Sequence, residues 1–153
     1  MKLIITYQEL QNIILRKTEK NISFQKATEG NTVKAAYKVS VDVPLLGNLS
    51  KDIDCDITFN GITGTELDIS YSLPMGLDLV GKGLKTFLGK QIESTQLLKW
   101  GEKDNQIILF VDKIAEKLHV DGVEKTTKYL RITDIRVLEE GLEITAELNY
   151  ESL

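Results

Sequence analysis

Strict two-residue alternation of apolar and polar side chains is the feature of this sequence that most limits its fold. It is clearest in three consecutive segments, 33–43, 53–59 and 64–73, and in the last of them the alternating apolar residues run from Leu67 to Leu73. A strand with this pattern turns one face to a core and the other to water. Three such strands in a row predict an antiparallel meander with one dry face and one wet face.

Turn residues separate these segments. Glu29-Gly30-Asn31 precedes the first segment and Pro44 ends it. Asn60-Gly61 is a strong signal for a tight turn after the second segment. Two further hairpins are expected, one joining 96–100 to 106–114 and one joining 129–138 to 142–150 around Glu139-Glu140-Gly141.

Two segments have helical periodicity instead. Thr6 and Glu9 fit a capping box, and Leu10, Ile13 and Ile14 follow at helical spacing, so we expect a short helix over 7–18. A second amphipathic helix is expected over 76–92. Its apolar stripe consists of Leu77, Val80, Leu84, Phe87, Leu88 and Ile92.

The composition suits a single folded domain. The chain has 153 residues, of which 42% are hydrophobic and 27% charged, and no linker, repeat or charge block divides it. We therefore expect one domain over 1–153 of the α+β class. Its predicted core is a long, strongly twisted antiparallel β-sheet wrapped around one amphipathic helix, with the short N-terminal helix beside it.

Charge and cysteine content narrow the function classes. The net charge is −4, which is unfavourable for a nucleic-acid-binding protein, so no nucleic-acid partner is expected. One Cys and one His exclude a disulfide framework and a Cys/His zinc site. The residues after Thr6 are too polar to continue a signal peptide, which predicts a cytoplasmic protein; an envelope location stays open if a leader has been removed.

Residues with chemical potential do not form a recognisable catalytic set. Asp52, Asp54 and Asp56 imitate the start of a calcium loop, but Ile57 and Thr63 stand where that loop needs Gly and Glu. His119 has no evident orienting partner, which a general base requires. We therefore expect a protein that is not an enzyme and has no cofactor or metal site.

The apolar strand faces offer more surface than two helices of modest length can cover. Such a sheet can enclose an apolar groove beside a helix, and apolar ligands bind in grooves of this kind with few polar anchors. The alternative is that the same side chains pack against one another and leave no cavity.

The order of elements resembles the tubular lipid-binding superfamily, which includes the halves of bactericidal/permeability-increasing protein. The resemblance begins at Ile5-Thr6-Tyr7-Gln8-Glu9-Leu10-Gln11-Asn12 and extends through the meander, the second helix and the later hairpins. It implies a curved sheet around helix 76–92 with a lipid or another apolar small molecule between them. On this interpretation the groove is lined by Ile53, Ile57, Phe59, Leu67, Ile69, Tyr71, Leu77, Val80, Leu84 and Phe87.

Two other functions compete with a ligand carrier. The first is a closed α+β protein-interaction or structural module, without a small-molecule ligand, that pairs through an exposed strand edge. The second is a peripheral membrane protein, because segment 76–99 combines an apolar stripe with Lys82, Lys85, Lys90 and Lys99. The oligomeric state stays open in all three interpretations.

Overall fold

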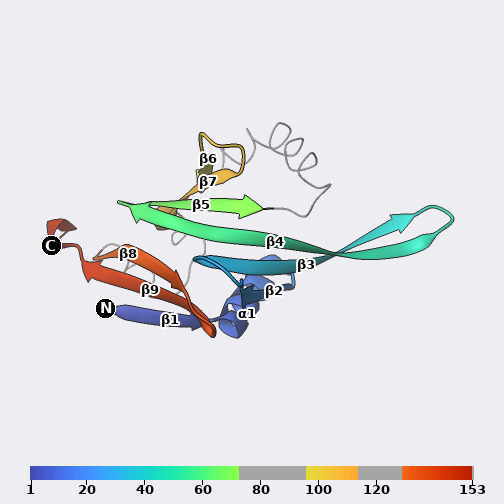
Figure 1. Ribbon diagram of the computed structural model, residues 1–153, viewed down its shortest axis with the longest axis horizontal. Helices are drawn as coiled ribbons and strands as arrows, with labels where there is room; N and C mark the ends of the chain where they lie inside the picture. The colour runs from blue at the N-terminus through green and yellow to red at the C-terminus, as the bar shows by residue number, and fades with distance from the viewer. Residues whose placement is uncertain (73–95, 114–128, 153) are drawn as a thin grey trace.

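The computed structural model describes residues 1–72, 96–113 and 129–152. In these ranges antiparallel β-structure predominates, with a 12-residue α-helix near the N-terminus (Figure 1). The elements are β1 (Lys2–Thr6), α1 (Tyr7–Thr18), β2 (Ile22–Lys26), β3 (Thr32–Val43), β4 (Gly47–Thr63), β5 (Glu66–Ser72), β6 (Leu98–Trp100), β7 (Gln106–Phe110), β8 (Leu130–Val137), β9 (Gly141–Leu148) and the 3₁₀ helix η1 (Tyr150–Ser152). The mixture of antiparallel strands with a short helix confirms the predicted α+β class. No helix in the described ranges is both long enough and apolar enough to cross a bilayer.

Within the described ranges, the strands form two antiparallel sheets. The large sheet has the order β2-β3-β4-β5-β7-β6, and the small sheet has the order β1-β9-β8. The expectation of one continuous sheet is therefore wrong. The N-terminal strand pairs with the C-terminal hairpin, with Leu3 opposite Ile144, so both ends of the chain leave the meander and build a separate sheet. The predicted central helix 76–92 lies outside the described residues.

The N-terminal helix forms as its sequence predicts. The Thr6 hydroxyl accepts a hydrogen bond from the Glu9 backbone N–H at 3.2 Å, and the Glu9 carboxylate accepts one from the Thr6 N–H at 2.9 Å. This reciprocal pair is the predicted capping box, and it satisfies donors that the first helical turn leaves open. The helix ends at Thr18 and is capped by Glu19, whose φ of 60° is left-handed and whose N–H donates to the Leu15 carbonyl.

The meander β3-β4-β5 is confirmed, but one of its predicted turns is wrong. Asn60-Gly61 lies inside β4, where the register with β5 shifts between Phe59 and Gly61. The actual turn lies at Gly64-Thr65, where Gly64 has a φ of 62°. Gly61 has a φ of 157°, and an Asn-Gly pair with this backbone freedom suits a β-bulge as well as a hairpin turn. The Asn60 side chain donates across to Asp68 and Ser70 of β5.

The two later hairpins are also confirmed, with shorter strands than expected. β6 and β7 pair around residues 101–105, and β8 and β9 pair around residues 138–140. Residues 111–113 have helical backbone, although the sequence predicts that this strand continues to 114.

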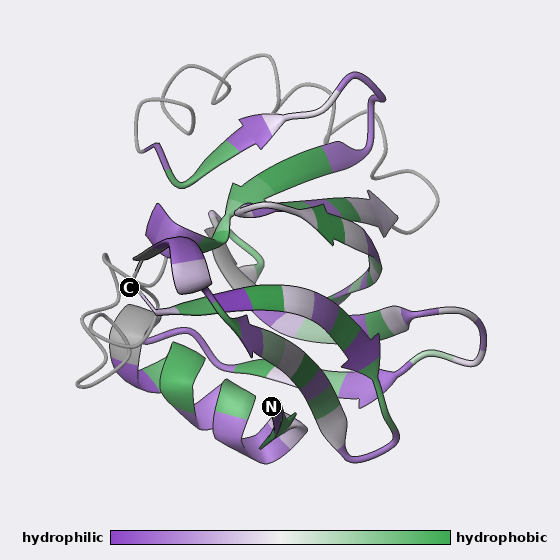
Figure 2. Ribbon diagram, turned by 90° about the vertical axis from the view of Figure 1, so that its left-hand side faces the viewer, coloured by the Kyte–Doolittle hydropathy of each residue, from purple (hydrophilic) through white to green (hydrophobic). Residues whose placement is uncertain are grey.

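Alternation separates the two sides of the large sheet. Figure 2 shows hydrophobic and hydrophilic bands following one another along the strands. On the polar side, Lys34 lies 4.0 Å from Asp56 and Lys99 lies 3.2 Å from Glu66. These exposed ion pairs contribute little to the free energy of folding. The large sheet is therefore stabilised mainly by burial of the apolar side chains on its other side.

Asn31 joins the two sheets. Its side-chain amide donates to the Ile135 carbonyl of β8 at 2.8 Å, and its side-chain oxygen accepts from the Val137 N–H at 2.7 Å. These two backbone groups are two residues apart and therefore face the same edge of β8. The same amide also donates to the Phe59 carbonyl of β4 at 3.3 Å. The Asn31 carboxamide thus makes the hydrogen bonds to β8 that a neighbouring strand would otherwise make. Because Asn31 immediately precedes β3, these bonds connect β8 to the large sheet.

The β8–β9 turn packs against the start of α1. The Tyr7 hydroxyl donates to the Leu138 carbonyl at 2.6 Å, and the Tyr7 N–H donates to the Glu140 carbonyl at 3.1 Å. Burial, with the nearby carboxylates of Glu139 and Glu140, raises the pKa of the Tyr7 phenol. Gly141 is buried, and a Cβ at this position would lie 2.7 Å from Thr6 Cα and even closer to the Ile5 carbonyl. The close approach of the two strands therefore requires glycine here.

We predict that Asn31→Ala lowers the free energy of unfolding by roughly 2–4 kcal/mol, because it leaves the Ile135 carbonyl and Val137 N–H without their partner. Chemical denaturation measures this change. Asn60→Ala is the matched control: it removes the same group from an exposed site and should cost under about 1 kcal/mol. Equal losses for the two variants would contradict the role given to Asn31.

Candidate ligand-binding face

The candidate site is one face of the large sheet, which we call the apolar face. Directly opposite residues on antiparallel strands project to the same side, so the register identifies the members of this face. The apolar members are Ile22 and Phe24 in β2; Val33, Ala35 and Tyr37 in β3; Ile53, Cys55, Ile57, Phe59 and Ile62 in β4; Leu67, Ile69 and Tyr71 in β5; Leu98 and Trp100 in β6; and Ile107 and Leu109 in β7. At the end of β2 the register also places one charged residue, Lys26, opposite Val33 on this face. The face is continuous across all strands of the large sheet.

Six of the predicted groove residues belong to this face and lie next to one another. Ile57 is opposite Tyr71, and Phe59 is opposite Ile69. Ile53 lies four residues before Ile57 in β4 and pairs with Tyr37 of β3, and Leu67 pairs with Ile62 beyond the bulge. The remaining predicted members, Leu77, Val80, Leu84 and Phe87, lie outside the described residues.

The apolar face is only partly removed from water. Of its members, only Val33, Ala35, Leu67 and Ile69 are buried, and Val33 is the most enclosed at 2% exposure. Ile53, Ile57, Phe59 and Tyr71 are half-buried. In the described part of the chain no large side chain is fully enclosed, although a domain of this size normally has several in its core. The face therefore retains apolar surface that another group could cover.

The bulge in β4 keeps the apolar face continuous. Without an extra residue between Phe59 and Ile62, the alternation would direct Ile62 to the polar side. With the bulge, Ile62 lies opposite Leu67, which in turn lies opposite Leu109 of β7. The polar side is continuous too, because Asn60 hydrogen bonds to Asp68 and Ser70 there.

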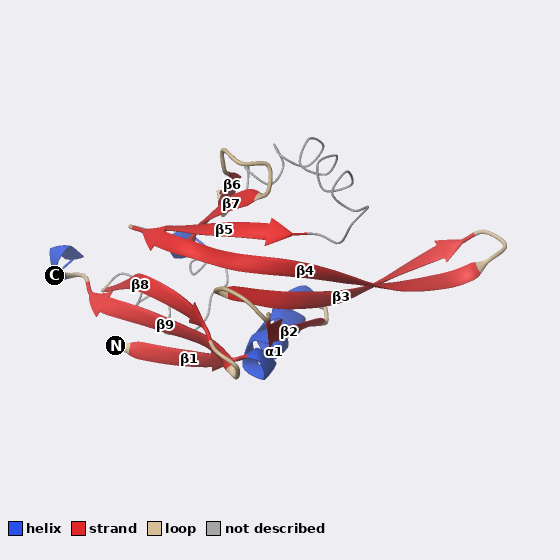
Figure 3. Cartoon of the chain, in the orientation of Figure 1, coloured by secondary structure: helices blue, strands red, loops and turns tan. Residues whose placement is uncertain are grey.

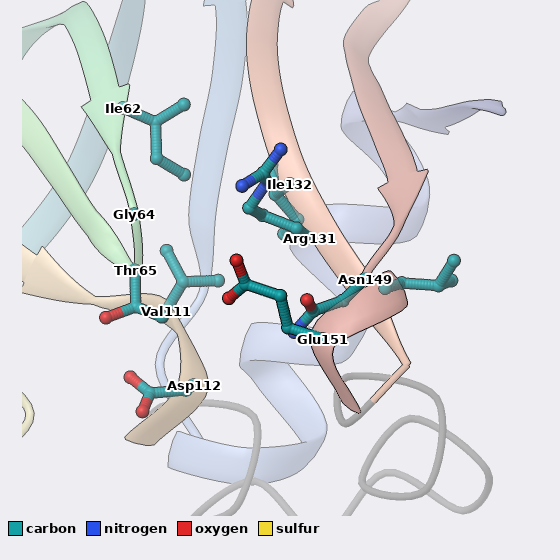
Figure 4. Close-up of a pocket in the computed structure, with 10 residues that line it drawn as sticks. Ile62, Gly64, Thr65, Val111, Asp112, Arg131, Ile132, Asn149 and Glu151 are labelled. Atoms are coloured by element: carbon teal, nitrogen blue, oxygen red, sulfur yellow. The ribbon is translucent and has the colours of Figure 1, made fainter. Parts of the chain in front are cut away.

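A cavity of about 260 Å³ lies where the two sheets meet (Figure 4). Its apolar wall consists of Ile62 from β4, Val111 after β7, and Ile132 with Leu130 from β8. Figure 4 shows charged side chains beside that wall. They are Asp112, Arg131 and Glu151. This volume is below the roughly 300–1,000 Å³ of typical small-molecule sites, so the cavity is too small to be the main ligand site and only extends the apolar face.

The sequence reasoning did not identify this cavity. Its residues come from four segments far apart in the chain, and none carries a motif that would group them. The Asn60-Gly61 pair predicts the end of a strand just before Ile62, so the sequence does not place Ile62 on the apolar face. The alternation of 142–150 did predict a strand, but not that it would form part of a second sheet.

Cys55 and Tyr71, both on the apolar face, favour their neutral forms. Burial, and then the neighbouring Asp56 carboxylate, raise the pKa of the Cys55 thiol, although a backbone hydrogen bond from Ser72 lowers it somewhat. Burial, with smaller effects of Cys55 and Asp104, raises the pKa of the Tyr71 phenol. A neutral thiol is a weak nucleophile, so Cys55 is suited to packing against apolar groups.

The described residues provide no constellation for metal chemistry. No group of three or more His, Cys, Asp or Glu side chains in the described ranges could hold a metal ion. Asp52, Asp54 and Asp56 alternate along β4, where Asp52 pairs with Lys38 and Asp56 with Lys34 of β3. His119 lies outside the described residues.

Comparison of this chain with protein-family models, with curated proteins and with solved structures finds no match.

We predict that Cys55 reacts with iodoacetamide more slowly in the folded chain than in the chain unfolded by denaturant, and that its reaction rate rises at higher pH, because its thiol pKa is raised. Rates measured from about pH 6 to about pH 10 test this. By linkage, the contribution of this group to stability is fully present below the thiol's ordinary pKa and is lost as pH rises through the raised value. Identical pH profiles in the folded and unfolded chains would contradict the prediction.

Proposed function

We propose that this chain is a non-catalytic binding protein for a lipid or another apolar ligand, held against the apolar face of the large sheet. One observation carries the proposal: the apolar face is continuous over six strands, but only four of its members are buried. Water contact with such a surface costs about 25 cal/mol for each Å² of apolar area. A ligand that covers the half-buried part removes this cost.

The chemistry of the face favours an alkyl chain over a polar ligand. Apart from Lys26 at the end of β2, its members are aliphatic and aromatic side chains with one thiol, and its two phenols lie at Tyr37 and Tyr71. Each methylene buried against such a surface contributes about 0.8 kcal/mol, so a medium-length acyl chain supplies enough free energy for micromolar binding. No polar anchor is needed for that affinity.

The finer arrangement is also part of the proposal. We propose that segment 76–92 covers the half-buried side chains as an amphipathic helix and that the ligand lies between this helix and the sheet. The supporting evidence is the sequence stripe that includes Leu77, Val80, Leu84 and Phe87. This is the arrangement that the resemblance to the tubular lipid-binding superfamily implies.

We predict that the delipidated chain binds a fluorescent fatty-acid analogue with micromolar affinity and that Ile53→Glu weakens this binding about tenfold or more, because it places a carboxylate on the apolar face. Asp54→Gln is the matched control, since Asp54 is the next residue of β4, exposed on the opposite face. It should leave affinity unchanged. Native mass spectrometry of the freshly purified chain should also reveal co-purified acyl chains.

Thermal unfolding of both variants separates loss of the ligand site from loss of the fold. The proposal fails if the folded wild-type chain binds no apolar probe. It also fails if Ile53→Glu and Asp54→Gln, both folded, bind the probe as tightly as the wild type does.

A second candidate function, a protein-interaction module, has its own supporting observation. β1 has a neighbour on one side only in the described part of the chain, and Met1, Leu3 and Ile4 are 70%, 55% and 45% exposed. An exposed apolar edge strand of this kind pairs readily with another strand. Light scattering that reveals a stable dimer in the absence of probe binding would favour this function over the first.

A further inference from the structure

The β3–β4 hairpin extends as an arm beyond the rest of the described chain (Figures 1 and 3). Its tip carries two adjacent leucines, Leu45 and Leu46. The strands stay in register to the end, with Asp42 opposite Asn48 and Val43 opposite Gly47. Pro44, Leu45 and Leu46 form the loop between them. Leu45 is 105% exposed and Leu46 is 71% exposed, so neither side chain packs on the body of the protein.

The backbone of this loop is itself unusual. Leu45 has a φ of 74°, in the left-handed region that non-glycine residues rarely occupy. Gly47, two residues later, has a φ of 79°, which suits glycine. An outlier of this kind is a reason to look for a function that requires leucine here, because asparagine or glycine would fit the backbone better. Single exposed leucines are common on protein surfaces, but two adjacent ones at the apex of an arm are not explained by folding.

We propose that the Leu45-Leu46 tip inserts into the interfacial region of a lipid bilayer and docks the protein reversibly on membranes. The tip is too small to be the binding surface for a protein partner. A convex apex with two adjacent side chains cannot bury the roughly 1,000 Å² that a stable protein interface needs. A bilayer needs no complementary shape, since its acyl chains rearrange around the inserted group.

The positions of the charged residues on the arm allow its tip to reach the interfacial region of a bilayer. Residues 43–49 carry no charge, and the nearest charged positions are Asp42 and Lys51. At about 3.3 Å per residue, the apex lies roughly 7–10 Å beyond Asp42, which matches the depth of about 5–10 Å that interfacial segments reach. Because the uncharged tip offers nothing for anionic headgroups to attract, binding should not depend on them.

Flotation with phosphatidylcholine vesicles tests the proposal, using the full chain. We expect the wild type to float with the vesicles, equally at about 50 mM and about 500 mM salt. The variant Leu45→Asn with Leu46→Ser should lower the partition coefficient at least about tenfold. Leu148→Ser is the matched control, because Leu148 is 51% exposed but lies in β9, away from the arm. It should not change the partition coefficient.

The choice of asparagine keeps folding separate from binding. Asparagine tolerates the left-handed backbone at position 45, so the double variant should unfold at the same temperature as the wild type or higher. A second variant, Leu46→Trp, should gain a blue-shifted fluorescence component when vesicles are added, beyond any change from Trp100 in the wild type.

Three results would overturn the proposal. The first is a wild type that does not float. The second is flotation that the arm variants leave unchanged, or that requires anionic lipid and disappears at high salt, as expected for lysine-rich segment 76–99. The third is a shift in oligomeric state on substitution of Leu45 and Leu46 without lipid, which would identify a second copy of the chain as the partner. Vesicle flotation does not require a ligand bound to the apolar face, so this proposal can fail or succeed independently of the proposed function.

Discussion

The need to keep one face of the large sheet from water organises this protein. β4 is the centre of that sheet, because it pairs with β3 over most of its length and with β5 beyond the arm. Alternation along these strands gathers their apolar side chains on one side, and the bulge at Gly61 preserves this sorting to the end of β4. A sheet with one apolar face is stable only if something covers that face. In the described part of the chain several side chains of the apolar face are only half-buried, and the proposed function rests on this incomplete burial.

The second constraint is how the small sheet attaches. Its outer strand β8 would present free backbone groups at its edge, and the Asn31 carboxamide satisfies two of them from the start of β3. On the opposite side, the β8–β9 turn lies against Tyr7, where Gly141 permits backbone contact that no side chain would allow. Both contacts use polar backbone groups with defined geometry, so they fix the position of the small sheet more specifically than apolar packing could.

Local features were well predicted from the sequence, and long-range features were not. The capping box at Thr6 and Glu9 and the alternation of β3, β4 and β5 depend on neighbours a few residues apart, which the sequence displays directly. The Asn60-Gly61 pair was misinterpreted because the same backbone freedom serves a turn or a bulge, and only the pairing partner decides between them. The pairing of β1 with β9, the Asn31 contact and the cavity beside Ile62 bring together residues from segments that are distant in the chain.

The candidate face was partly predictable for the same reason. Ile53, Ile57 and Phe59 share a face through local alternation, and the register confirms that Tyr71 and Ile69 lie opposite two of them. Alternation cannot show how much of a face stays uncovered, because that depends on which elements pack over it. Pro44 predicts only the end of a strand, and nothing in the local sequence indicates that Leu45 and Leu46 stay exposed.

The occupant of the apolar face is the central claim, and isoleucine-methyl NMR with a spin-labelled fatty acid tests it most directly. Ile53, Ile57 and Ile69 lie on the apolar face, whereas Ile4 and Ile13 are exposed isoleucines at β1 and α1. The account predicts that the spin label broadens the methyl signals of the first group and leaves those of the second group sharp. Broadening confined to Ile4 and Ile13, or no broadening at saturating ligand, would contradict it.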